Sequence, residues 1–179
     1  MFIVMAIGAG AILGSFLGGL IGNKLYNLKA SYQPLFCGIS VLVGILPMAY
    51  ILNYPSQIGS AQPAYLMPVV VGFVAGIIIT FCSPNMNAIL LNVNTPETRG
   101  SVLSLFNLVN DLGKGFGPFI ISILIMHFGR VSAFNISNLF WVVCGIILLL
   151  AAGSLPKDQA GLNRYLLEKA KAIKESAKS

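Results

Sequence analysis

Hydrophobic residues fill five long stretches of this 179-residue chain, with few polar residues between them. Each stretch is at or near the roughly 20 apolar residues that a helix needs to cross a ~30 Å hydrocarbon core. Runs such as Val69-Val70-Val71 are apolar on every side, whereas a membrane β-strand would alternate apolar and polar residues. The pattern therefore predicts an all-α integral membrane protein. Its predicted spans are residues 2–21, 34–52, 65–91, 101–128 and 134–152.

Composition agrees with this class of protein. Hydrophobic residues make up 56% of the chain and charged residues 9%, where a soluble domain carries about 25% charged. The net charge of +6 does not indicate nucleic acid as a partner, because no basic patch is interleaved with aromatic residues. The sequence also has no paired carboxylates, His cluster or nucleophile constellation. We therefore predict no enzymatic activity, no cofactor and no metal site.

The three cysteines fall in three different predicted spans. Cys37, Cys82 and Cys144 show neither zinc-site spacing nor the pattern of a disulfide framework. Free cysteine is often buried and behaves as a small hydrophobic residue. We expect these three to be packing residues.

Charges in the loops predict the orientation of the bundle. Lys24 and Lys29 follow the first span, Arg99 follows the third, and a basic tail follows the fifth. The second loop, residues 53–64, has no Lys or Arg. By the positive-inside rule, the first loop, the third loop and the C-terminus face the cytoplasm of a multi-pass protein. Residues 1–155 then form the bundle and residues 156–179 the cytoplasmic tail.

The first span carries glycines at strict four-residue spacing. Gly10, Gly14, Gly18 and Gly22 fall on one stripe of a helix, which allows another backbone to approach closely. The pattern predicts tight helix packing and says nothing about chemistry.

The third span contains Ser83-Pro84-Asn85, which predicts a break or kink. Proline removes one backbone hydrogen bond, and Asn85 and Asn87 are polar enough to supply replacement partners. Two interpretations are open, a packing kink and a polar lining of a cavity.

The fourth span carries the polar stripe that would cost most in lipid. Asn107, Asn110, Asp111 and Lys114 are three or four residues apart and share one face of a helix. Each charge near the middle of a span costs roughly 2.5–3.5 kcal/mol, so this face should point into the bundle or a watered cavity. One interpretation is an ion pair that only holds helices in place. The other is a substrate or coupling-ion site, for which Asn85 and Asn87 are further candidates.

Two segments resemble the major facilitator superfamily of transporters. Residues 18–27 are similar to the family's Gly-x-x-x-Asp-Arg-x-Gly-Arg loop, with Asn23 in the place of Asp. Residues 94–101, continued by residues 104–107 and 111–118, resemble the family's cytoplasmic loop and eleventh helix, with features of its spinster-like members. The loop-motif residues are then Gly19, Asn23, Lys24, Pro96, Glu97, Arg99 and Gly100. The resemblance assigns Gly113, Gly117 and Pro118 to helix packing.

The resemblance implies that the five spans correspond to helices eight to twelve of a twelve-helix carrier. The chain would then be a fragment that lacks the seventh helix and the N-terminal half, and the whole carrier would move a small solute by alternating access. The solute, the membrane and any coupling to a proton or ion stay open. The alternative is a small helical membrane protein with an interaction or assembly role through its glycine-rich face.

The tail differs from the rest of the chain. Apolar residues recur there at helical spacing with lysines between them, which predicts a short basic amphipathic helix. We expect it to rest on the anionic cytoplasmic leaflet, and a plain solvated tail is the alternative. The apolar positions are Leu162, Leu166, Ala170, Ile173 and Ala177.

Overall fold

The computed structural model describes residues 1–54 and 66–176, and within them it contains helices and no strand. The helices are α1 (Phe2–Leu28), α2 (Tyr32–Asn53), α3 (Leu66–Thr80), α4 (Cys82–Val93), α5 (Arg99–Phe128) and α6 (Arg130–Ser176). Taking α3 and α4 together, five helical stretches of the described chain are long and apolar enough to cross a membrane. The prediction of an all-helical chain with five such stretches is confirmed. Residues 55–64 of the second loop and the predicted start of the third span at Tyr65 lie outside the described residues.

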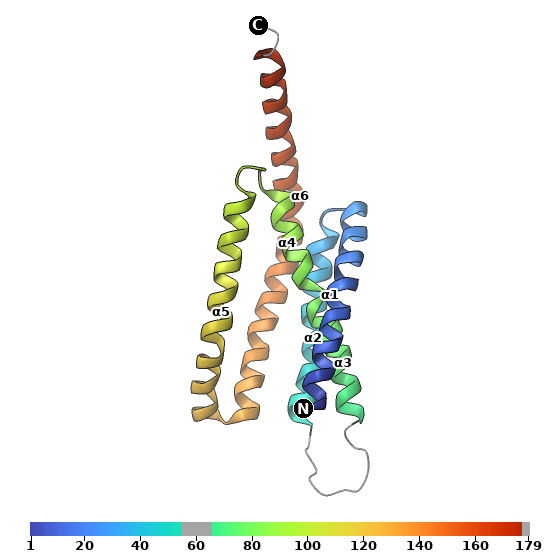
Figure 1. Ribbon diagram of the computed structural model, residues 1–179, viewed down its shortest axis with the longest axis vertical. Coiled ribbons are helices and arrows are strands. Elements are labelled where there is room, and N and C mark those ends of the chain that lie inside the picture. The colour runs from blue at the N-terminus through green and yellow to red at the C-terminus, as the bar shows by residue number, and fades with distance from the viewer. Residues whose placement is uncertain (55–65, 177–179) are drawn as a thin grey trace, which may run out of the picture.

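The five helical stretches, with α3 and α4 counted as one, run alternately up and down (Figure 1). The α1–α2 turn, the α4–α5 connection and the end of α6 lie at one end of the bundle. The segments that carry Lys24, Lys29 and Arg99 are therefore together at the end from which the basic part of α6 extends. At the other end, α5 turns into α6 through Gly129, whose φ of 78° suits glycine best.

Helix α1 packs against α3 through glycines on both helices. A Cβ atom on Gly10 would lie 2.2 Å from the carbonyl oxygen of Phe73, and one on Gly76 would lie 2.2 Å from that of Ile7. Gly14 is equally close to the α3 backbone. Because the nearest atoms belong to the backbone, no side-chain movement would make room. Helices α1 and α3 are thus able to lie this close because these glycines have no side chain.

A second glycine contact joins α2 to α6. A Cβ on Gly38 would lie 2.8 Å from the side chain of Leu149 and 3.0 Å from the carbonyl oxygen of Gly145. A Cβ on Gly145 would in turn lie 2.7 Å from the side chain of Leu42. Helix α2 also contacts α3 and α4, so it connects the two glycine-packed pairs.

The third spanning stretch is interrupted at Phe81, three residues before Pro84. There the amide of Phe81 donates to the carbonyl of Ile78 at 3.3 Å, and α4 begins at the next residue. Pro84 has no amide hydrogen, so the carbonyl of Thr80 loses its usual helical donor. The break separates α3, which packs on α1, from α4, which carries Ser83, Asn85 and Asn87.

Helix α6 is longer than predicted. The sequence pattern predicts a span that ends at residue 152 and then a separate short helix, whereas α6 is one helix of 47 residues that passes through Pro156. At 1.5 Å per residue it is about 70 Å long and extends beyond the other helices (Figure 1). The predicted helix in the tail is confirmed, but the prediction that it is separate from the fifth span is wrong. An internal proline removes one helical hydrogen bond and crowds the preceding turn. Here Ala152 and Leu155 beside it are buried, and the residues that follow include many good helix formers such as Ala, Leu, Lys and Glu.

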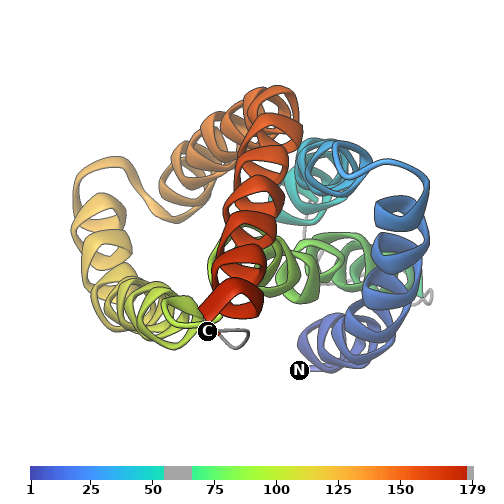
Figure 2. The same cartoon turned by 90° about the horizontal axis from the view of Figure 1, so that it is seen from above.

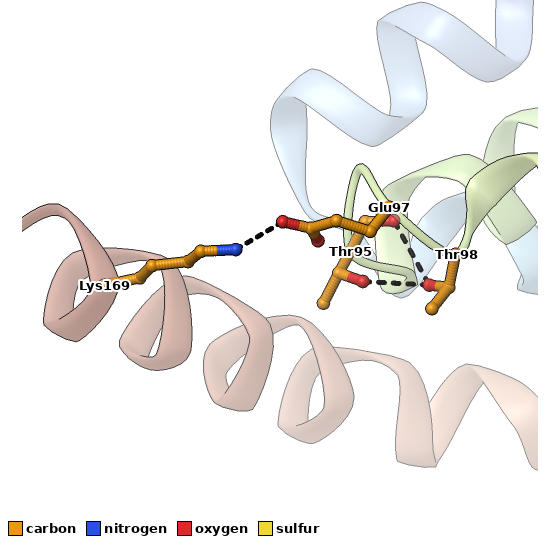
Figure 3. Close-up of polar contacts among 4 residues, drawn as sticks. All are labelled: Thr95, Glu97, Thr98 and Lys169. Carbon is orange, nitrogen blue, oxygen red and sulfur yellow. Dashed lines mark hydrogen bonds and ion pairs between the residues drawn. The ribbon is translucent and has the colours of Figure 1, made fainter. Parts of the chain in front are cut away.

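Two polar contacts tie this extension of α6, residues 153–176, to the rest of the chain. The ammonium of Lys169 donates to the carboxylate of Glu97 in the α4–α5 connection (Figure 3). The amide of Gln159 donates to the hydroxyl of Tyr26 near the end of α1. Both charged side chains are about half exposed, so the ion pair positions the extension and adds little stability.

The Glu97–Lys169 pair predicts a pH-dependent attachment. The hydrogen bond from Lys169 holds the pKa of Glu97 below its usual range, and Glu97 raises the pKa of Lys169. Since the folded-state pKa of Glu97 is lowered, the attraction is complete above the unfolded-state pKa and is lost as pH falls through the folded-state value. We expect Lys169→Met to raise the Glu97 pKa in a carbon-13 NMR titration. Lys171→Met, a control two residues further along α6, should leave it unchanged, and an equal pKa in all three proteins would contradict the contact.

Candidate functional site

A polar cleft of about 390 Å³ lies between the α3–α4 stretch and α5. Its lining combines apolar side chains with carboxamides and one ammonium group. The lining residues are Ile79, Cys82, Ser83, Met86 and Asn87 from one side and Phe106, Asn107, Asn110 and Lys114 from α5. A cleft with a few convergent polar groups on an apolar wall is the usual form of a small-molecule site.

The cleft brings together four of the six residues that the sequence marks as substrate or coupling-ion candidates. Asn107, Asn110 and Lys114 line it from α5, and Asn87 faces them from α4. Carboxamides both donate and accept hydrogen bonds, and an ammonium group donates three. This arrangement is able to bind a polar solute through several hydrogen bonds at once.

Asp111 does not line the cleft. Its carboxylate accepts a hydrogen bond from the Lys114 ammonium at 2.9 Å, three residues further along the same helix. The two side chains are 69% and 77% exposed. The ion pair is therefore internal to α5 and does not join α5 to another helix. Of its two residues, only Lys114 lines the cleft.

Helix α5 lies at the outside of the bundle (Figure 2). It contacts α4 and α6, and none of its residues is buried. Gly113 and Gly117 have nothing in the described chain within 4 Å of an added Cβ, and Pro118 is exposed. The helix face predicted to pack through these three residues is thus open, as is the outer side of the cleft.

The remaining candidate, Asn85, belongs to a buried polar network on the opposite side of α4. Its side chain is 1% exposed, and its amide donates to the carbonyl of Gly18 at 2.9 Å and to that of Phe81 at 2.7 Å. Its carbonyl oxygen accepts a hydrogen bond from the amide of Gln33 at 2.9 Å. The network connects α1, α2 and α4, which makes Asn85 a structural residue here.

Two features of this network are not evident in the sequence. Gln33 is 2% exposed, and an uncharged polar residue at the start of a span is only a weak signal for such a role. Gly22 makes room for the network, because a Cβ there would lie 1.6 Å from the carbonyl oxygen of Asn85. The glycine stripe of α1 therefore admits a backbone at one end and a polar side chain at the other.

The residues of the two loop motifs lie at the same end of the bundle. The first motif is helical, because α1 continues to Leu28; Asn23 and Lys24 are exposed there, and Gly19 faces Pro84. The second motif forms the α4–α5 connection. Its residues Pro96 and Glu97 precede α5, Gly100 lies in the first turn, and Arg99 donates to the carbonyl of Asn94 at 3.2 Å.

Comparison with models of protein families, with curated proteins and with solved structures finds no match for this chain.

Asn85 and Asn87 provide a matched pair for testing the two polar regions. Asn85→Ala leaves the Gln33 amide and the Gly18 carbonyl without their partner, and we expect it to lower stability by roughly 1–2 kcal/mol. Asn87→Ala removes an exposed side chain and should stay within about 0.5 kcal/mol of the parent. The measurement is unfolding of the detergent-solubilised chain in increasing sodium dodecyl sulfate. Equal stability of the two variants would contradict the assignment of Asn85 to a buried network.

Proposed function

We propose that this chain is the C-terminal part of a secondary-active carrier similar to the major facilitator superfamily. In this proposal α1 to α6 correspond to the family's helices eight to twelve, and the cleft between α4 and α5 forms one side of the solute pathway. The observation that supports it most is the convergence of Asn87, Asn107, Asn110 and Lys114 on that cleft. The two loop segments that resemble the family support the same assignment.

The cost of the polar face of α5 supports the same proposal. Lys114 lies near the middle of a 30-residue helix, where a charge facing lipid is expensive. Polar and charged residues at this depth usually face a bundle interior or a water-filled cavity and mark a transport pathway. A cleft that is open on its outer side is expected of one half of a carrier whose two halves rock around a central site.

The alternative role, assembly through the glycine-rich face, has less support. Gly10, Gly14, Gly18 and Gly22 are all buried within the chain, against α3 and α4. The face proposed for an external partner is thus already occupied.

The carrier proposal also places the basic end of the bundle in the cytoplasm, in accordance with the positive-inside rule.

The test is solute uptake by a complete carrier, in which this chain is expressed together with a seventh helix and an N-terminal half. The double variant Asp111→Asn with Lys114→Gln leaves no unpaired charge in the bilayer, so we expect it to fold. It also removes the ammonium from the cleft, which should lower uptake by about tenfold or more. Uptake from a defined mixture of solutes is followed by mass spectrometry of cell extracts at matched surface expression.

Two controls accompany this experiment. Lys157→Gln with Asp158→Asn removes an equal and opposite pair of charges from the α6 extension and should leave uptake unchanged. The isolated chain in liposomes should show no saturable uptake. Near-normal uptake by the first double variant would contradict a substrate-binding role for Lys114, and saturable uptake by the isolated chain would contradict the half-carrier proposal.

A further inference from the structure

The polar cleft between α4 and α5 carries charge of one sign. Of the described residues that line it, only Lys114 has a charged side chain. Its partner Asp111 lies outside the cleft, and the Lys114 ammonium donates one hydrogen bond to it at 2.9 Å. An ammonium group has three hydrogens, so two remain for a solute. The cleft therefore offers a solute a positive charge and no negative one.

Carboxamide groups follow this ammonium along α5. Asn110 precedes Lys114 by four residues and Asn107 precedes it by seven, so all three lie on one face of the helix. At 1.5 Å per residue, the backbone positions of Asn110 and Lys114 are about 6 Å apart along the axis. A carboxamide oxygen accepts a hydrogen bond from a cationic group without adding a charge of its own. A small solute that binds the Lys114 ammonium through one group is therefore within reach of the Asn110 carboxamide with a second group.

The rest of the lining is largely apolar. Ile79, Cys82 and Met86 line the cleft from the α3–α4 stretch, and Phe106 adds an aromatic ring from α5. Transfer of an apolar group from water to such a wall is favourable. A sugar, with hydroxyl groups on every side, would lose hydrogen bonds to water there without replacing them. The lining thus fits a solute with polar groups at one end and an apolar group at the other.

Charge balance restricts the solute further. The Asp111–Lys114 ion pair has no net charge, so a simple organic anion bound at Lys114 would leave one unpaired negative charge in low dielectric. A simple organic cation would find no carboxylate in the cleft. A solute with both a carboxylate and an ammonium group supplies the anion that Lys114 attracts and keeps the site neutral.

We propose that the solute is a zwitterionic amino acid with an apolar side chain, an assignment that rests on the proposed carrier function. Its carboxylate accepts hydrogen bonds from the Lys114 ammonium. Its own ammonium group donates to the carboxamide oxygen of Asn110, and its side chain lies against Met86 and Phe106.

The test is binding of L-leucine to the full chain in lipid nanodiscs, measured by saturation-transfer NMR, which detects weak binding. Three competitors are used to displace carbon-13-labelled leucine: isocaproate, which is leucine without the ammonium group, isopentylamine, which is leucine without the carboxylate, and glucose. We expect leucine to bind. Each competitor should bind more weakly than unlabelled leucine by about tenfold or more, because each lacks at least one hydrogen bond that involves a charged group.

Two double variants locate the site. Asp111→Asn with Lys114→Gln removes the ammonium and leaves no unpaired charge, so leucine binding should fall by about tenfold or more. Lys157→Gln with Asp158→Asn, the matched control on the α6 extension, should bind leucine as the parent does. Circular dichroism and the elution volume show whether each variant keeps the fold. Asn110→Leu, which is similar in shape, is a second site variant and should also weaken binding.

Absence of leucine binding by the parent would overturn the proposal, as would binding of isocaproate or glucose as tight as that of leucine. Equal leucine binding by the parent and by a folded Asp111→Asn, Lys114→Gln variant would overturn it as well. The carrier proposal fails on a different result. Leucine binding by the chain, without saturable uptake of any solute by the complete carrier, contradicts the carrier proposal and supports the binding site. Uptake of other solutes without leucine binding contradicts the amino-acid assignment alone.

Discussion

The close approach of α1 to α3 is the contact on which the arrangement of the other helices depends. In a bilayer the lipid is as apolar as the helix surfaces, so helices associate through close packing and interhelical hydrogen bonds. Gly10 and Gly76 each place a neighbouring carbonyl where a side chain would otherwise stand. The same stripe of glycines leaves room at Gly22 for Asn85, whose hydrogen bonds attach α1 and α2 to α4.

Helix α5 stands in contrast to this tightly packed part. It has no buried residue, and its glycines lie open. The helix that carries the polar stripe is therefore also the one least constrained by the rest of the chain. In the carrier proposal this combination is useful, because a helix that lines the pathway must change its neighbours as the two halves rock. The α6 extension contacts both the tightly packed part, through Tyr26 on α1, and the start of the α5 segment, through Glu97.

The sequence predicts those features that depend on periodicity along one helix. The five spanning stretches follow from runs of apolar residues, and the polar stripe of α5 follows from the spacing of Asn107, Asn110 and Lys114. Where such a stripe points is decided by other helices, so the sequence does not separate Lys114, which reaches the cleft, from Asp111, which does not.

A single sequence likewise does not predict which distant residues contact each other. The contact of Gln33 with Asn85 depends on how α2 meets α4, and it has no local signal. The continuity of α6 was missed for a different reason. A proline marks a helix end in most sequences, but α6 continues through Pro156, next to the buried residues Ala152 and Leu155.

The most direct test of this account compares two glycines of α1. A Cβ on Gly14 would lie 2.3 Å from the carbonyl oxygen of Ile77, whereas one on Gly8 would have nothing in the described chain within 4 Å. We expect Gly14→Leu to destabilise the chain by about 1–3 kcal/mol or more, as overpacking does, and Gly8→Leu to have little effect. The measurement is the temperature at which the detergent-solubilised chain loses its monodisperse elution peak. A clearly lower temperature for Gly14→Leu alone is the predicted result, and equal temperatures for the two variants would contradict the glycine contact as the basis of the fold.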